Sequence, residues 1–174
     1  MAHEEKANLT WSIRPASKED AYRLAEIKSA AREPEIPGGG RRTESEALDF
    51  LDRLALPHGD DYFCVVAEEH GQIVGYLIGG GSRDLDRKAH GEVYEIAVLP
   101  ASRRRGVAKA LLSDALGRFD AAAFAGTLLS APTNDEVIAR LATGLGMRAD
   151  GSRGEGHSTR YERGLNATNH VAST

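Results

Sequence analysis

The 174-residue sequence predicts an α/β (α+β) fold with a central sheet. Two observations carry this prediction: strand-like apolar runs alternate with helical periodicities, and one strand leads through a tight loop directly into a helix. The predicted order is strand, two helices, three strands, helix, strand, helix, two strands. We expect a flexible N-terminus at 1–10, a single domain at 11–164 and a flexible tail at 165–174.

The first half of the chain begins with a strand at 11–16. Ser17 and Asp20 then have the spacing of a capping box and mark the start of a helix. A loop rich in proline and glycine at 34–40 ends it, and a second helix follows at 44–54. On this second helix we expect one apolar face, formed by Ala47, Leu48, Leu51 and Leu54.

The second half is predicted to contain most of the sheet. Strands at 62–67 and 73–78 flank a hairpin turn at 69–72, and the glycines of 79–82 are expected to end the second strand. The helix at 106–118 should bury its apolar positions, Val107, Leu111, Leu112 and Ala115. The remaining elements are a strand at 92–98, a strand at 127–131, a helix from Asn134 to about Gly144, and strands at 146–149 and 158–162.

Composition excludes several classes of function. The formal net charge of −4 argues against a nucleic-acid-binding protein, which needs a basic face. No apolar run approaches the ~20 residues of a membrane span. Cys64 is the only cysteine and the N-terminus has no signal-peptide core, so we expect a cytoplasmic protein. No His/Cys cluster has metal-ligand spacing, and no metal is expected.

The segment 95–112 is the most informative part of the chain. An apolar strand ends at Pro100, the loop 101–105 contains three arginines, and Gly106 opens a helix. A loop that becomes a helix N-terminus directs free N–H groups and the positive end of the helix dipole at one point, which suits a phosphate. A side chain at Gly106 would hold that phosphate away from the backbone.

The spacing Val98-x-Pro100-x-x-Arg103-x-x-Gly106-x-Ala108, followed by Leu111-Leu112, resembles the acetyl-coenzyme A signature of the GNAT superfamily of N-acetyltransferases. The order of elements resembles the fold of that family across essentially the whole chain. The resemblance implies the GNAT fold, with a central mixed, mostly antiparallel sheet of six to seven strands flanked by four helices. It also implies an acyltransferase that uses acetyl-CoA as cosubstrate.

The resemblance assigns coenzyme-binding residues. Ala97 and Val98, at the end of the strand, correspond to the positions that pair with the pantetheine arm, and the Val98 N–H to the oxyanion donor. The loop that would hold the pyrophosphate consists of Arg103, Arg104, Arg105, Gly106, Val107 and Ala108.

At three of the assigned positions, the residue either differs from the family pattern or has a second interpretation. The family often has glycine at the position of Arg104, but only the N–H is needed there. Lys109 could contact a phosphate or simply face solvent. Asn134 resembles a residue that helps to hold the pantetheine arm, and a plain N-cap is an equally good interpretation.

Acetyl transfer to an amine needs a neutral nitrogen, whereas a free alkylamine has a pKa of about 10.4. A positioned carboxylate can accept the proton. Glu95 and Glu92 lie on the strand that leads into the loop, where members of this family often place their base. We favour Glu95, which is nearer the expected thioester, and take Glu92 second. Either could instead be a charge partner within the sheet.

The general acid departs from the family pattern. Ala142 occupies the position where the family commonly has tyrosine. Tyr94, Tyr161 and His157 remain as candidates, although a lone strand tyrosine is more often a packed aromatic. A thiol pKa of about 8.5 makes the thiolate a tolerable leaving group, so the missing tyrosine does not imply loss of activity.

The acceptor is less defined. Acidic side chains at Glu33, Glu35, Asp84 and Asp86 would suit a polyamine or an aminoglycoside, and the coenzyme segment resembles that of aminoglycoside 3-N-acetyltransferases. Arg41 and Arg42 could instead bind a carboxylate. We expect acetylation of a primary amine of a small molecule, an antibiotic among the candidates. The alternatives are a protein or peptide acceptor and a catalytically silent CoA-binding module. Homodimers are common in the family.

Overall fold

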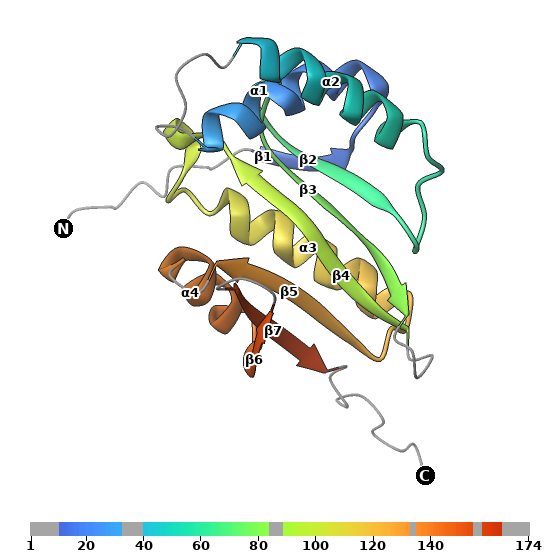
Figure 1. Ribbon diagram of the computed structural model, residues 1–174, viewed down its shortest axis with the longest axis vertical. Helices are drawn as coiled ribbons and strands as arrows, with labels where there is room; N and C mark the ends of the chain where they lie inside the picture. The colour runs from blue at the N-terminus through green and yellow to red at the C-terminus, as the bar shows by residue number, and fades with distance from the viewer. Residues whose placement is uncertain (1–10, 33–39, 84–88, 133–134, 155–157, 165–174) are drawn as a thin grey trace, which may run out of the picture. The chain divides into compact units, whose positions relative to one another are not determined.

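The structure is a computed structural model that describes residues 11–32, 40–83, 89–132, 135–154 and 158–164 (Figure 1). Within these residues the chain forms seven strands and four α-helices in the predicted order. The expected terminal segments, 1–10 and 165–174, lie outside the described residues, and so does the loop at 33–39.

The strands form one mixed sheet with the order β1-β2-β3-β4-β5-β7-β6. β4 and β5 pair in parallel, whereas β1/β2, β5/β7 and β6/β7 pair antiparallel. This confirms the mixed sheet expected from the sequence. The bounds are β1 Trp11–Pro15, β2 Phe63–Glu69, β3 Gln72–Arg83, β4 Ala89–Val98, β5 Gly126–Pro132, β6 Arg148–Gly154 and β7 Ser158–Gly164.

The four α-helices are α1 Ala21–Arg32, α2 Gly40–Leu54, α3 Val107–Ala121 and α4 Glu136–Gly144. Short 3₁₀ turns precede α1 and α3, at Lys18–Asp20 and Pro100–Ser102. Among the described helices, none combines the length and apolar character needed to cross a membrane.

The chain divides into two compact units. The first comprises 1–55, 65–76 and 97–111, and the second comprises 56–64, 77–96 and 112–174. Four elements, β2, β3, β4 and α3, contribute residues to both. The single domain expected at 11–164 stays a prediction.

In the first unit, α1 and α2 lie side by side (Figure 1). Phe50 of α2 packs edge-on against Tyr76 of β3, with ring centroids 5.3 Å apart. β2 and β3 are joined through His70 and Gly71, whose φ angles of 51° and 75° are those of a two-residue hairpin turn. The predicted hairpin is therefore confirmed.

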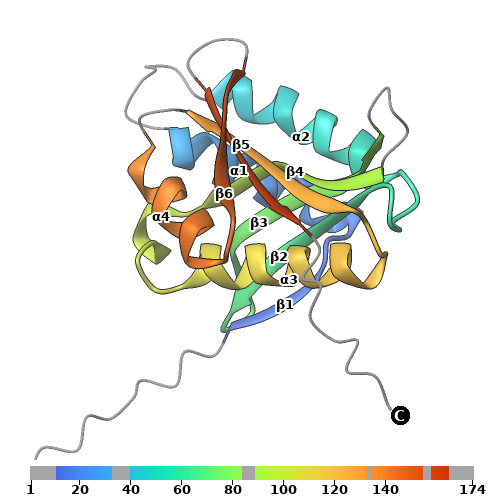
Figure 2. The same cartoon turned by 90° about the horizontal axis from the view of Figure 1, so that it is seen from below.

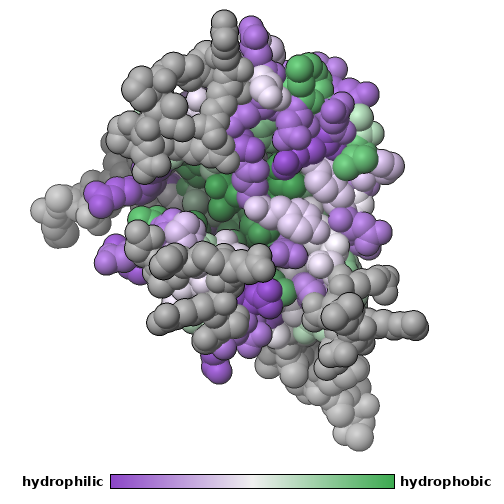
Figure 3. Space-filling view, in the orientation of Figure 1, coloured by the Kyte–Doolittle hydropathy of each residue, from purple (hydrophilic) through white to green (hydrophobic). Residues whose placement is uncertain are grey.

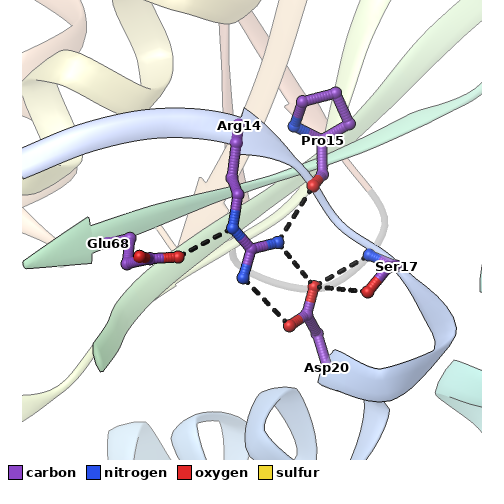
Figure 4. Close-up of polar contacts among 5 residues, drawn as sticks. All are labelled: Arg14, Pro15, Ser17, Asp20 and Glu68. Atoms are coloured by element: carbon purple, nitrogen blue, oxygen red, sulfur yellow. Dashed lines mark hydrogen bonds and ion pairs between the residues drawn. The ribbon is translucent and has the colours of Figure 1, made fainter. Parts of the chain in front are cut away.

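The capping box at the start of α1 is also confirmed (Figure 4). The Asp20 carboxylate accepts hydrogen bonds from the Ser17 N–H at 2.8 Å and the Ser17 hydroxyl at 3.2 Å. Arg14 of β1 donates two further bonds to Asp20, at 2.8 and 3.1 Å, and one to Glu68 of β2 at 2.7 Å. These bonds join the helix start to two strands.

The predicted apolar face of α2 is wrong in part. Ala47 and Leu54 are buried, but Leu48 is 65% and Leu51 is 39% exposed, and the buried aromatic is Phe50. The helix packs through the spacing 47, 50, 54, because Phe50 meets Tyr76 of the sheet. The surface of α2 is therefore partly apolar. Figure 3 shows hydrophobic areas on the otherwise hydrophilic surface at the place where Figure 1 draws α2.

In the second unit, β7 pairs with β5 and with β6 (Figure 2). Phe119 of α3 packs between Phe63 and Phe124, with ring centroids 5.5 and 5.9 Å away. Cys64 is buried, as expected.

The expected end of β3 at 79–82 is wrong, since the strand continues through these glycines to Arg83. A Cβ at Gly79 would lie 3.0 Å from both the Glu92 carbonyl oxygen and the Phe63 ring, and a Cβ at Gly80 would overlap the backbone of Asp61. The glycines therefore permit close approach of neighbouring chains and do not break the strand. β4 likewise begins earlier than expected, at Ala89.

Candidate active site

The strand–loop–helix segment of the first unit has the predicted shape. At the end of β4, the Leu99 N–H donates to the Val74 carbonyl at 2.9 Å. A 3₁₀ turn at Pro100–Ser102 follows. Arg104 and Gly106 then adopt left-handed φ angles of 61° and 87°, and α3 begins at the next residue. Alternation of left- and right-handed residues creates a concave backbone surface that binds anions.

The N–H groups of this loop are available to such an anion. Within the described residues, the backbone N–H groups of 104–109 make no hydrogen bond to the protein. The first N–H that bonds back is that of Ala110, which donates to the Gly106 carbonyl at 2.9 Å. The loop and the first turn of α3 thus present successive free donors at the positive end of the helix dipole.

The side chains of the three arginines differ in their contacts. The Arg103 guanidinium donates to the carbonyl oxygens of Val98, at 3.3 Å, and Ala31, at 3.1 Å. Arg105 forms a two-bond ion pair with Glu69. Arg104 and Lys109 are exposed, without an ion pair in the described part of the chain.

Four other residues assigned to the coenzyme flank this loop along the chain. Ala97 and Val98 end β4 and are each 8% exposed. Val107 is buried and Ala108 is half-buried on the first turn of α3. A Cβ at Gly106 would meet only the Trp11 ring, at 3.5 Å, so the glycine is required by its φ angle and not by lack of space.

A pocket lies in the second unit, where the parallel pairing of β4 and β5 ends. The register runs from Gly91↔Thr127 to Val93↔Leu129 and goes no further. The pocket has a volume of about 240 Å³. It is lined by Val93, Tyr94, Glu95, Ile96, Leu129, Ser130, Ala131, Pro132, Asp135 and Ile138.

The two candidate bases occupy different places. Glu95 lines the pocket and is half-buried. Glu92 lies in the paired part of β4, opposite Leu128, and is not among the lining residues. The structure therefore brings one of the two predicted carboxylates to the pocket. The catalytic role of either stays a prediction.

Tyr94 lines the same pocket, and its pKa is raised above the ordinary value, first by burial and then by the negative charges of Glu92 and Asp61. Its hydroxyl donates to the Gly81 carbonyl at 3.3 Å. The group therefore remains protonated at neutral pH and already has an acceptor.

Tyr161 is not brought to the pocket. It is 7% exposed on β7, opposite Leu129 of β5 and Ala149 of β6, and it is absent from the lining residues. Its catalytic assignment stays a prediction. His157 lies outside the described residues.

The start of α4 differs from expectation. Asn134, the expected first residue and coenzyme contact, lies outside the described residues. The N-cap is Asp135, whose carboxylate accepts from the N–H groups of Val137, at 3.1 Å, and Ile138, at 3.0 Å. Ala142 is fully buried and supplies no hydroxyl.

Two polar residues of the pocket, Asp135 and Ser130, were missed in the sequence. Asp135 could have been found, because Asn134 and Asp135 are both good caps and the acidic Glu136 suits a first helical turn. Ser130 carries no such signal, since a serine within a strand is ordinary. Its place at the pocket depends on where β4 and β5 part.

Comparison with known proteins agrees with this geometry. The sequence model of the acetyltransferase (GNAT) family matches residues 22–147, which is most of the chain. No significant match is found among curated proteins.

Three solved structures illustrate the similarity in fold. The phosphinothricin acetyltransferase of Sinorhizobium meliloti in complex with acetyl-CoA is 24% identical, with a TM-score of 0.68 and coverage of 95% of this chain and 94% of that one. The yncA protein of Salmonella typhimurium, with its cofactor acetyl-CoA, is 22% identical, with a TM-score of 0.68 and coverage of 95% and 98%. The ribosomal-protein-S18-alanine N-acetyltransferase of Escherichia coli is 15% identical, with a TM-score of 0.67 and coverage of 95% and 100%.

The free N–H groups of the loop, the order of strands and the family match agree with one another. The chain belongs to the GNAT family of acetyltransferases, enzymes that use acetyl-CoA as cosubstrate.

Proposed function

We propose that this chain transfers the acetyl group of acetyl-CoA to a primary amine of a small molecule, with Glu95 as general base. The observation that carries the proposal is the pocket at the end of the β4/β5 pairing. Among the described residues, its lining includes two carboxylates, Glu95 and Asp135, and no Lys, Arg or His. An acidic lining attracts an ammonium group, and a carboxylate can then accept its proton.

The coenzyme side of the proposal rests on the loop. The N–H groups of 104–109, free of partners within the described residues, suit the pyrophosphate. The exposed side chains of Arg104 and Lys109 add positive charge beside it. Val98 is proposed to supply the N–H that stabilises the oxyanion.

Few side chains of the protein take part in the proposed reaction. Acetyl-CoA supplies an acetyl group activated as a thioester. Glu95 takes the proton of the ammonium, directly or through water, and the neutral nitrogen attacks the carbonyl carbon. The N–C bond forms first and gives a tetrahedral oxyanion, whose collapse breaks the C–S bond. The nitrogen releases its second proton to water and the departing thiolate takes one from water, so that these two transfers cancel and one proton stays on Glu95 until it passes to solvent. Because Ala142 offers no hydroxyl, the proposal needs no side-chain acid.

A protein or peptide acceptor is the alternative. It is favoured by the similarity in fold to an enzyme that acetylates the alanine of ribosomal protein S18 and to Arabidopsis thaliana NAA60 in complex with a bisubstrate analogue. Tyr94, 46% exposed at the pocket, offers a surface against which a peptide could pack.

Aminoglycoside-type antibiotics are included among the proposed small-molecule acceptors, on the resemblance of the coenzyme segment. The cytoplasm is the proposed location, because the sequence has a single cysteine, Cys64, and so cannot form an internal disulfide.

Thiol release tests the proposed function. The protein is incubated with acetyl-CoA and a panel of aminoglycosides, polyamines, amino acids and short peptides, and free CoA thiol is measured. Release with one class of small amines supports the proposal, and release only with peptides supports the alternative. Binding of CoA without release across the whole panel would indicate a silent CoA-binding module.

A further inference from the structure

We infer that Glu69 is a positioning residue of the coenzyme loop. It holds Arg105 in a fixed place, so that phosphates are bound by the backbone N–H groups and not by the Arg105 guanidinium. This inference rests on the proposed function, because it concerns the loop assigned there to the coenzyme.

The ion pair between the two residues is the first observation. The Arg105 Nη1 donates to Glu69 Oε2 at 3.0 Å, and Nη2 donates to Oε1. The Glu69 side chain is 12% exposed, whereas that of Arg105 is 41% exposed. Two parallel bonds between guanidinium and carboxylate fix orientation as well as distance, so the buried partner determines where Arg105 points.

The place of Glu69 in the sheet is the second observation. It is the last residue of β2, and its partner across the β1/β2 pair is Trp11. The Trp11 ring lies 3.5 Å from the position that a Cβ on Gly106 would occupy. Glu69 and Trp11 thus support two successive residues of the loop, Arg105 and Gly106.

The backbone of the loop explains why such support is needed. Arg104 has a φ of 61°, which costs a residue with a side chain roughly 1–2 kcal/mol. Conformations of this kind persist only where their surroundings hold them. Arg103, held by the carbonyls of Val98 and Ala31, secures one side of Arg104, and Arg105, held by Glu69, secures the other.

Removal of the Glu69 carboxylate should change CoA affinity in opposite directions, depending on whether Arg105 binds phosphate directly or is held by Glu69 to position the loop. If Arg105 bound phosphate directly, Glu69 would compete for it, and removal of the carboxylate would strengthen coenzyme binding. If Glu69 positions the loop, its removal weakens binding although a negative charge has been taken away from an anion site.

Calorimetric titration with CoA separates these cases. We expect Glu69→Ala and Arg105→Ala each to weaken binding by roughly five- to tenfold, the effect of losing a partly exposed pair that orders a binding loop. The double variant should bind no more weakly than either single variant, since one interaction is lost in all three. Glu69→Gln, which keeps one hydrogen bond, should recover part of the affinity.

Two controls make the test specific. Glu68→Ala removes the neighbouring carboxylate, which pairs with Arg14 and not with the loop, and should leave CoA affinity unchanged. Arg105→Ala should leave the salt dependence of CoA binding as in the wild type, whereas Arg104→Ala should reduce it, because Arg104, unlike Arg105, is exposed and has no ion pair within the described residues.

The outcomes are distinguishable. Equal or tighter CoA binding by Glu69→Ala, with wild-type binding intact, would overturn this inference alone. Failure of the wild-type protein to bind CoA would overturn the proposed function and this inference with it.

Discussion

Glu95 and Glu92 share a strand but not an environment. The pocket begins where β4 stops pairing with β5, and only Glu95 lies beyond that point. A base has to reach the nitrogen of the acceptor, so position along the strand discriminates between two chemically identical side chains.

The pH–rate profile tests this distinction. Glu95→Gln is expected to lower the rate of acetyl transfer by about 10²–10⁴-fold, the usual contribution of a general base, and to flatten the rise of rate with pH. CoA affinity should be unchanged. Glu92→Gln serves as the matched control and should retain the wild-type profile. An unaltered profile for Glu95→Gln would exclude Glu95 as base.

Gly106 carries a second prediction at the residue scale. Gly106→Asp is expected to abolish CoA binding, because it places a negative charge at the proposed phosphate site and a side chain at a residue whose φ of 87° disfavours one. Arg104→Gly is the comparison: it keeps the N–H and suits the φ of 61°, so CoA should still bind, with only the loss that follows from removing the side-chain charge. Calorimetry that found unchanged affinity for Gly106→Asp would contradict the assignment of the phosphate loop.

Single residues of the site were predictable where their role is local. The Gly106 loop is a continuous run of sequence, and Glu95 comes shortly before it along the chain. Asp135 and Ser130 were missed because their presence at the pocket depends on strands and a helix that are far apart along the chain. The pairing of Arg105 with Glu69, 36 residues away, could not be read from the loop either.

At the scale of elements, the Asp20 carboxylate stabilises the start of α1 through its charged hydrogen bonds. Burial raises the pKa of Asp20, but hydrogen bonds from Arg14 and from Ser17 lower it by more, and the net pKa is below the ordinary value. A carboxylate whose pKa is lowered by folding stabilises the folded state above its unfolded pKa. That stability is lost as pH falls through the folded pKa, which here lies below 3.8.

Asp20→Asn should therefore destabilise the protein by roughly 1.5–3 kcal/mol at pH 7, the range for hydrogen bonds to charged groups. The difference from the wild type should shrink as the pH falls below 3.8 and through the lowered pKa of Asp20. Denaturant unfolding at several pH values measures it. A difference that did not vary with pH would show that the charge of Asp20 contributes nothing.

At the start of α4, the contribution of Asp135 to helix stability can be measured separately from the contribution of its charge to the pocket. Asp135→Ala removes the cap and should cost about 1 kcal/mol of stability. Asp135→Asn keeps an equally good cap and removes only the negative charge from the pocket. For the asparagine variant we expect unchanged thermal stability with a higher KM for amine acceptors. An unchanged KM would mean that Asp135 does not attract the acceptor.

The elements themselves were largely predictable, and the errors share one origin. Leu48 and Leu51 fit a helical apolar pattern as well as Phe50 does, so the pattern did not show which side of α2 meets the sheet. The glycines of 79–81 have the composition of a strand end. They lie within β3 and have no side chain there because Asp61, Phe63 and Phe124 approach them too closely to leave room for one.

At the scale of the whole molecule, the residues assigned to the coenzyme and those lining the pocket fall in different compact units. Ala97, Val98 and the loop 103–109 belong to the first unit, and all ten residues that line the pocket belong to the second. β4 contributes to both sets along one continuous strand.

Hydrogen exchange tests the coenzyme assignment across the chain. Saturating CoA should slow exchange of the backbone amides of 104–109, because these N–H groups lack protein partners in the described structure and would gain phosphate oxygens. At 100 times the Kd, CoA should also stabilise the fold by about 2.7 kcal/mol. Protection elsewhere, with none at 104–109, would contradict the assignment.

The sequence by itself determined the order of elements, the capping box, the hairpin turn, the strand–loop–helix segment that ends in Gly106 and the resemblance to the GNAT family. Each depends on residues only a few positions apart, where propensity, capping and turn chemistry act. The tertiary structure decided which face of α2 is buried, which glutamate reaches the pocket, and which carboxylate holds Arg105. These depend on contacts between distant segments, and no local pattern contains that information.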